Sequence, residues 1–113
     1  MPRYLISFND GDMTFPDEDL PAVGEASHAV VREAKAAGVW IFGAGLLDPA
    51  QASVVDTDGT ATDGPAPGRR EFLGGFSILE VASRDEALAW AARIAEACRC
   101  AQEVRELMDD PES

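Results

Sequence analysis

The chain has 113 residues, of which 46% are hydrophobic, and this is enough for one domain with a single core. Nine Lys and Arg residues face 21 Asp and Glu residues, which gives a formal net charge of −12. A field of this sign repels phosphate backbones and anionic lipid head groups, so the composition argues against nucleic-acid binding and against a role on a membrane surface. The many acidic residues are expected to confer solubility.

The cysteines and the apolar segments indicate a cytoplasmic protein. Cys98 and Cys100 are separated by one residue, which would strain a disulfide, and two thiols alone do not make a zinc site, so both are expected to be reduced. The apolar run after Arg3 is too short for a signal peptide. The longest uncharged apolar stretch, residues 36–47, is interrupted by glycines and falls short of the ~20 residues that span a bilayer.

In chain order, the sequence first predicts a strand, a helix and a second strand. Tyr4 to Phe8 are rich in aromatic and branched residues and predict the first strand. After an acidic loop, apolar residues at helical spacing predict a helix from about Pro21 to Ala37. Val39 to Phe42 predict a strand that is apolar, and therefore covered, on both faces. The next segment, Gly43-Ala44-Gly45, indicates a bulge or a close backbone approach.

The rest of the chain predicts a hairpin, a strand, a helix and a last strand. The hairpin is expected over residues 52–62, around the turn signal Asp58-Gly59. Gly74 to Val81 predict a main strand whose two glycines form a curving bulge. Ser83 and Glu86 form a capping box for a helix that buries Ala87, Ala91, Ile94 and Cys98. A short edge strand follows at about 102–107, so the domain covers 1–108 and residues 109–113 form a flexible tail.

This order of elements predicts an α+β fold of the ferredoxin-like type, with an antiparallel sheet and two helices on one face. The other face of the sheet also needs a cover, because Trp40, Phe42 and their neighbours are apolar. A second copy of the sheet is the simplest cover for a chain of this length. We therefore expect a homodimer with twofold symmetry.

Several short motifs, in order, resemble those of the YCII-related, or DGPF-domain, proteins. The resemblance implies the fold of that family, a dimeric α+β barrel in which two ferredoxin-like sheets face one another. The signature loop departs from the usual Asp-Gly-Pro-Phe-Ala-Glu-Thr-Lys-Glu at Ala66, Gly68 and Arg69, while Arg70 keeps the charge of the lysine. The motifs are Ala36-Ala37-Gly38-Val39, Gly45-Leu46, Asp63-Gly64-Pro65, Leu73-Gly74-Gly75-Phe76, Asp85-Glu86-Ala87-Leu88 and Glu103-Val104-Arg105.

His28 and Asp63 are the candidate catalytic residues. His28, the only histidine, falls on the side of its helix that carries Val31 and Lys35, away from the expected core stripe. It is either a surface or interface residue, or a pocket residue that exchanges protons near neutral pH. Asp63 either bonds its own backbone in an Asx-turn or orients His28. The resemblance favours the second interpretation of both residues, because a histidine–aspartate pair is the active pair proposed for the smaller family members.

Arg69 and Arg70 are the candidate substrate-binding residues. A guanidinium pair can bind a carboxylate or phosphate, but salt bridges to nearby acids are the plainer expectation. No dinucleotide, nucleophile-elbow or zinc motif occurs, so we expect no cofactor and no metal.

Two functions remain open. One is a cofactor-independent isomerase or lyase that acts on a small organic acid or lactone, an anionic metabolite. The other is a non-catalytic ligand-binding or regulatory module. The family resemblance suggests for the latter a link to extracytoplasmic-function sigma-factor signalling.

Overall fold

The computed structural model describes all residues, 1–113, and contains two α-helices and six strands. The bounds differ from the sequence-based expectations by a few residues at most. The helices are α1 (Leu20–Ala36) and α2 (Arg84–Cys98), and the strands are β1 (Arg3–Asn9), β2 (Trp40–Gly45), β3 (Ser53–Val55), β4 (Ala61–Asp63), β5 (Leu73–Glu80) and β6 (Glu103–Glu106). Single 3-10 turns lie at Asp17–Asp19 and Pro49–Gln51.

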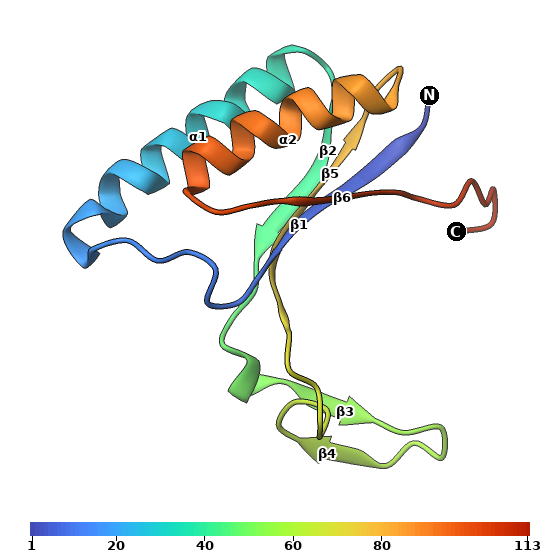
Figure 1. The fold of residues 1–113 in the computed structure, drawn as a ribbon. Helices are drawn as coiled ribbons and strands as arrows, with labels where there is room; N and C mark the ends of the chain where they lie inside the picture. Colours follow the sequence, from blue (N-terminus) through green and yellow to red (C-terminus); the bar gives the residue numbers. More distant parts are fainter.

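Four strands form one antiparallel sheet in the order β2-β5-β1-β6. Both helices lie on the same side of this sheet (Figure 1). This arrangement confirms the predicted α+β, ferredoxin-like fold with two helices on one face. The last strand, β6, lies at the edge of the sheet, as its weak alternation predicts.

Small residues on the helices let them pack closely on the sheet. Tyr4, Ile6 and Leu79 are almost fully buried on the helix-facing side of β1 and β5. The helices meet them with a stripe of buried residues that matches the predicted stripe of α2. The apolar stripe predicted for α1 consists of Val23, Ala26, Val30, Ala34 and Ala37. Only Val23 and Ala34 of this stripe are buried, whereas Ala26 and Ala37 are exposed.

The predicted capping box starts α2. The Ser83 hydroxyl accepts a hydrogen bond from the Glu86 amide at 3.2 Å, and the Glu86 carboxylate accepts one from the Ala82 amide at 3.2 Å. The helix ends at Arg99, which adopts a left-handed conformation with φ 58°. An ion pair of 2.8 Å with Asp19 holds this residue against the start of α1. Helix α2 is thus tied down at both ends by side chains.

Glycines let two aromatic rings lie directly on the sheet. A Cβ atom added to Gly43 would come within 2.6–2.7 Å of the Trp40 indole and 2.9 Å from the Phe76 carbonyl oxygen. At Gly75 an added Cβ would come within 2.7 Å of the Phe8 ring. The pairing of β1 with β5 shifts register at Gly74, which confirms the expected bulge at the glycine pair.

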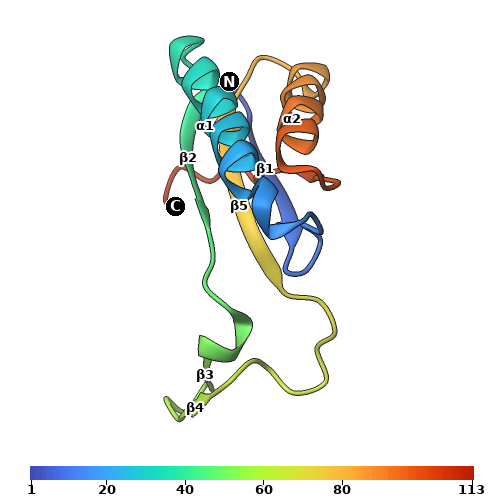
Figure 2. The ribbon, with the colours of Figure 1, turned by 90° about the vertical axis from the view of Figure 1, so that its left-hand side faces the viewer.

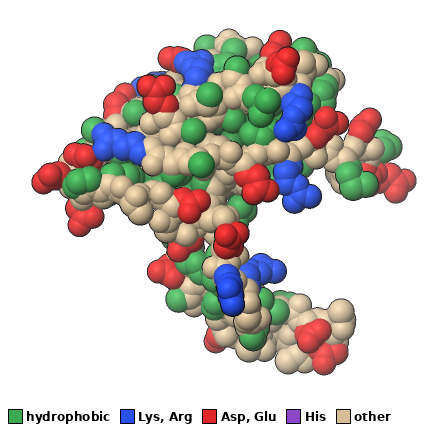
Figure 3. All heavy atoms as spheres, viewed as in Figure 1, with side chains coloured by type: hydrophobic (Ala, Val, Ile, Leu, Met, Phe, Trp, Pro, Cys, Tyr) green, Lys and Arg blue, Asp and Glu red, His purple; other side chains and the backbone are tan.

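Strands β3 and β4 form a separate hairpin, which extends away from the helices (Figures 1 and 2). We call residues 46–72, which carry it, the arm. The arm hangs below the body of the molecule in the space-filling view (Figure 3). It raises the radius of gyration to 15.8 Å, against about 13 Å for a compact chain of this length. No residue of the arm belongs to the hydrophobic core, and an isolated two-stranded hairpin is only marginally stable, so the arm contributes little to the stability of the domain.

The sheet face opposite the helices is open and apolar at its centre. Phe42 is 56% exposed, and its ring lies 6.0 Å from that of Phe76, centroid to centroid. Leu5 and Ile78 pair directly on the same face. We call these four residues the open-face patch. Neither helix is long and apolar enough to cross a membrane.

We predict that Gly43→Ala destabilises the protein, whereas Gly45→Ala does not. The added methyl group at position 43 collides with Trp40 and with backbone, which should lower the free energy of unfolding by roughly 1–3 kcal/mol. Gly45 lies in the same strand and has open space around the same atom, so it is the matched control. Urea unfolding of the three proteins tests the prediction, and equal midpoints for the two variants would contradict it.

We also predict that Tyr4→Phe reduces the loss of stability at alkaline pH. Burial raises the pKa of Tyr4 above its usual 10.0, and the hydrogen bond to Glu106 adds to this. Above pH 10 the tyrosine of the unfolded chain therefore ionises first, which favours unfolding. The stability that neutral Tyr4 provides is present below pH 10 and lost as the pH rises through the folded-state pKa.

Urea unfolding at pH 8 and pH 10.5 measures this effect. The free energy of unfolding should fall less for Tyr4→Phe than for the unsubstituted protein between these two values, since all other titrating groups are shared. Equal losses in the two proteins would show that Tyr4 does not contribute.

Candidate functional site

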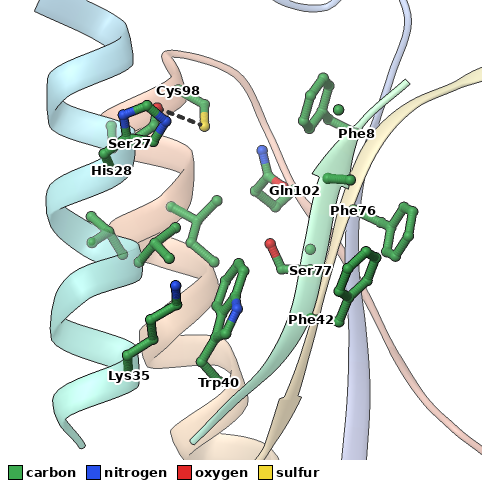
Figure 4. Close-up of a pocket in the computed structure, with 17 residues that line it drawn as sticks. Phe8, Ser27, His28, Lys35, Trp40, Phe42, Phe76, Ser77, Cys98 and Gln102 are labelled. Carbon is green, nitrogen blue, oxygen red and sulfur yellow. Dashed lines mark hydrogen bonds between the residues drawn. The ribbon is translucent and has the colours of Figure 1, made fainter. Parts of the chain in front are cut away.

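A cavity of about 450 Å³ lies between the helices and the β2–β5 half of the sheet. Its walls are mainly apolar, with Trp40 and Phe8 from the sheet, Val31 from α1 and Ile94 from α2. Figure 4 shows Trp40 between α1 and the strands, while Phe42 and Phe76 project from the other side of the sheet. The volume falls within the range of small-molecule sites, so the cavity is the candidate site.

The cavity contains the only histidine and the only lysine of the chain. His28 and Lys35 are seven residues apart on α1, which places them on one face and about 10.5 Å apart along the helix axis. Both side chains project from α1 toward the gap between helix and sheet (Figure 4). None of the 21 acidic residues lines the cavity. The protein has a net charge of −12, but the cavity has two basic side chains and no carboxylate.

Lys35 is free because the acidic residues of its helix are already paired. Glu25 forms an ion pair of 2.6 Å with Arg32, and Glu33 forms one with Arg93 of α2. Lys35 itself forms no ion pair. Its ammonium group therefore remains available to an anion that enters the cavity.

Ser27 and Cys98 form a polar contact in the wall of the cavity. The Ser27 hydroxyl donates to the Val23 carbonyl at 2.8 Å and lies 3.4 Å from the Cys98 sulfur. Because the single hydroxyl proton is already donated, the thiol must be the donor to the Ser27 oxygen. This contact joins α2 to α1 in the wall of the cavity.

Cys100 is the second thiol near this end of the cavity. Burial raises the pKa of the Cys100 thiol, and the nearby Cys98 and Asp12 raise it further. The Gln102 side chain donates to the Cys100 sulfur at 3.5 Å and to its carbonyl at 3.4 Å. Both cysteines are free, in agreement with the expectation that they are reduced. No group of three or more His, Cys, Asp or Glu side chains is placed to hold a metal ion.

The structure separates the other predicted site residues from His28. Asp63 lies in β4 on the arm, where its carboxylate accepts a hydrogen bond of 3.2 Å from the Ser53 hydroxyl. This cross-strand bond replaces the Asx-turn that the sequence suggested. Within one chain, Asp63 does not line the cavity that contains His28. A joint catalytic role for the two residues stays a prediction.

Arg69 and Arg70 are exposed on the arm, between β4 and β5. Neither lines the cavity, and neither forms an ion pair. The expected salt bridges to nearby acids are therefore wrong. The one acidic neighbour in sequence, Glu71, instead accepts a hydrogen bond from the Asn9 side chain at 3.4 Å.

Of the cavity residues, sequence reasoning had identified only His28 as a candidate, and those it missed include Lys35, Trp40, Ser77 and Gln102. Lys35 had a usable signal, because it is the only lysine and lies two helical turns from the only histidine. Trp40 was expected with Phe42 on the face opposite the helices, which is wrong, because a register shift between the two residues turns Trp40 to the helix-facing side. Ser77 and Gln102 belong to segments in or beside the sheet. Which side of the sheet their side chains face depends on strand register, and no local sequence pattern gives that register.

The fold and the cavity define an α+β protein of the ferredoxin-like class with a ligand-sized site between helices and sheet. The YCII-related domain family has a sequence model that matches residues 3–109, so the chain belongs to that family. No curated protein matches the chain in sequence.

Proposed function

We propose that this protein binds a small organic acid with an apolar body in the cavity between α1 and the sheet. One observation carries the proposal: the only histidine and the only lysine of a strongly acidic chain both line an apolar cavity from which every carboxylate is absent. The apolar walls fit the body of the ligand, and Lys35 or His28 fits its carboxylate.

The surroundings of Lys35 make it the stronger anchor. Lys35 is exposed where it lines the cavity, so solvent partly screens an ion pair there, and the apolar contacts of the ligand body must supply the rest of the affinity. The acids of α1 are engaged by Arg32 and Arg93, so a ligand carboxylate has no competitor on that helix. The net charge of the protein disfavours anions elsewhere on the surface, which makes this site selective.

Catalysis is a second proposal, favoured by the position of His28 at the same cavity. In this role His28 is the general acid/base of an isomerase- or lyase-type reaction and Asp63 is its orienting partner. Since Asp63 of the same chain lies on the arm, the carboxylate has to come from the arm of a second copy. Arg69 or Arg70 then anchors the substrate from the same arm. Binding alone requires only residues of one chain, so it is the function that the geometry supports best.

We predict that Lys35→Gln weakens the binding of small carboxylates by about tenfold or more. This corresponds to the loss of one hydrogen bond to a charged group, roughly 1.5–3 kcal/mol. Benzoate, cyclohexanecarboxylate and hexanoate are suitable probes, and amide chemical shifts of the isotopically labelled protein report both affinity and location. Shifts should concentrate on residues 27–35 and on β2.

Arg84→Gln is the matched control for this experiment. It removes the same charge from an arginine that forms no ion pair and does not line the cavity, so it should leave affinity unchanged. The uncharged amides of the same probes should bind weakly. Absence of binding by all three carboxylates, or equal losses in the two variants, would remove the anion site.

We further propose that the open-face patch is covered by a second copy of this chain. Four large apolar residues gather at the centre of a sheet face that nothing in one chain covers, and Phe42 is more than half exposed. Charged pairs border this patch, including the 2.8 Å bridge between Arg3 and Glu80. An apolar centre with a polar rim is the usual anatomy of a protein–protein interface.

We predict a dimer mass in solution at micromolar concentration, and a monomer mass for Phe42→Glu. A carboxylate in the centre of the patch would be buried without a partner in the dimer. Leu88→Glu is the control, because Leu88 is 41% exposed on α2, on the helix side of the molecule. Sedimentation equilibrium measures the three masses. A monomeric unsubstituted protein would overturn the proposed assembly.

A further inference from the structure

The floor of the cavity is almost free of side chains. Gly43 pairs with Ser77, and Gly45 pairs with Gly75, on adjacent strands β2 and β5. Directly paired residues face the same side of a sheet, here the side of Trp40 and Leu79, which the helices cover. Three glycines and a serine therefore form this strip of the sheet, and only the serine has a side chain of its own.

Two aromatic rings bound this strip. The Trp40 indole lies against Gly43, and the Phe8 ring lies against Gly75, in each case so closely that a Cβ atom would not fit. Figure 4 shows the two rings at opposite ends of the cavity, with Ser77 between them. Gly45 pairs with Gly75 on the edge strand β2, and an added Cβ there would meet nothing within 4 Å, so the floor is open beside the Phe8 ring.

Helix α1 forms the side of the cavity that lies opposite this strip. Val31 of α1 lines this side of the cavity, and Lys35 and His28 lie at its opposite ends (Figure 4). The space is thus bounded by flat backbone below, by an aromatic ring at each end and by one cationic group near Trp40. A flat molecule can lie on the backbone and meet both rings by its edges, the geometry that aromatic pairs prefer. A puckered saturated ring is thicker and gains no such contacts.

We propose that the ligand of this cavity is a planar aromatic carboxylate, with its ring on the glycine floor between Trp40 and Phe8 and its carboxylate on Lys35. The inference rests on the proposed anion-binding function and specifies the chemical class of the ligand.

The test compares 2-naphthoate with decahydro-2-naphthoate, which has the same carbon skeleton and charge but no flat rings. Amide-shift titrations of the full chain give both affinities. We expect 2-naphthoate to bind roughly tenfold more tightly, since two edge contacts with aromatic rings each contribute several-fold.

Two variants locate the cause of this preference. Phe8→Leu removes one flanking ring and should reduce the preference several-fold. Gly45→Val places a branched side chain on the open floor, where the space around its Cβ atom is free, so the protein should still fold while 2-naphthoate is excluded. Retained preference in both variants would show that the rings and the floor do not select the ligand.

The outcomes also separate this inference from the function on which it rests. If the saturated acid binds as tightly as 2-naphthoate or more tightly, the aromatic preference is wrong, whereas the anion site stands. If neither acid binds and Lys35→Gln changes nothing, the anion site falls and the aromatic inference falls with it. A preference of about tenfold that disappears in Gly45→Val supports both.

Discussion

The close contact of two aromatic rings with glycine backbone is the constraint on which the candidate site depends. Trp40 and Phe8 can lie on the sheet only because Gly43 and Gly75 have no side chains. The rings occupy the ends of the β2–β5 surface and hold α1 away from its centre, while small residues such as Ala34, Ala87 and Ala91 bring the helices close over β1 and β5. One sheet face thus has a tightly packed half and a hollow half. The cavity follows from this unequal packing.

The charged residues are also distributed unevenly between the surface and the cavity. Most of the acidic residues are exposed on the surface, and four of the nine cationic residues form ion pairs there. Such exposed pairs contribute little to stability, so their main effect here is to engage the acids that would otherwise compete for Lys35. The cavity consequently differs from the remainder of the molecule in both polarity and sign of charge. This contrast, more than any single residue, supports a binding role.

Local patterns were sufficient to predict the fold, because each element carries its own signal. Ser83 and Glu86 marked the start of α2, the aromatic and branched residues marked β1, and the glycine pair marked the bulge in β5. The site was harder to predict. His28 and Lys35 share a helix, so their common face was readable, but Asp63 and Arg70 belong to the arm, whose direction is set by no periodic pattern. Trp40 was assigned with Phe42 to the face opposite the helices, because nothing in the sequence shows the register shift that puts the two rings on opposite faces of the sheet.

The arm is closed at its base by backbone hydrogen bonds. The Leu46 amide donates to the Gly74 carbonyl at 2.8 Å, and the Asp10 amide donates to Phe72 at 2.7 Å. Everything beyond these bonds can therefore vary without a change in the register of the main sheet. Lengthening such a segment costs little entropy, since the cost of closing a loop grows only slowly with its length. The arm is the part of this protein in which evolution can add, shorten or rewrite sequence while the packed half of the sheet stays as it is.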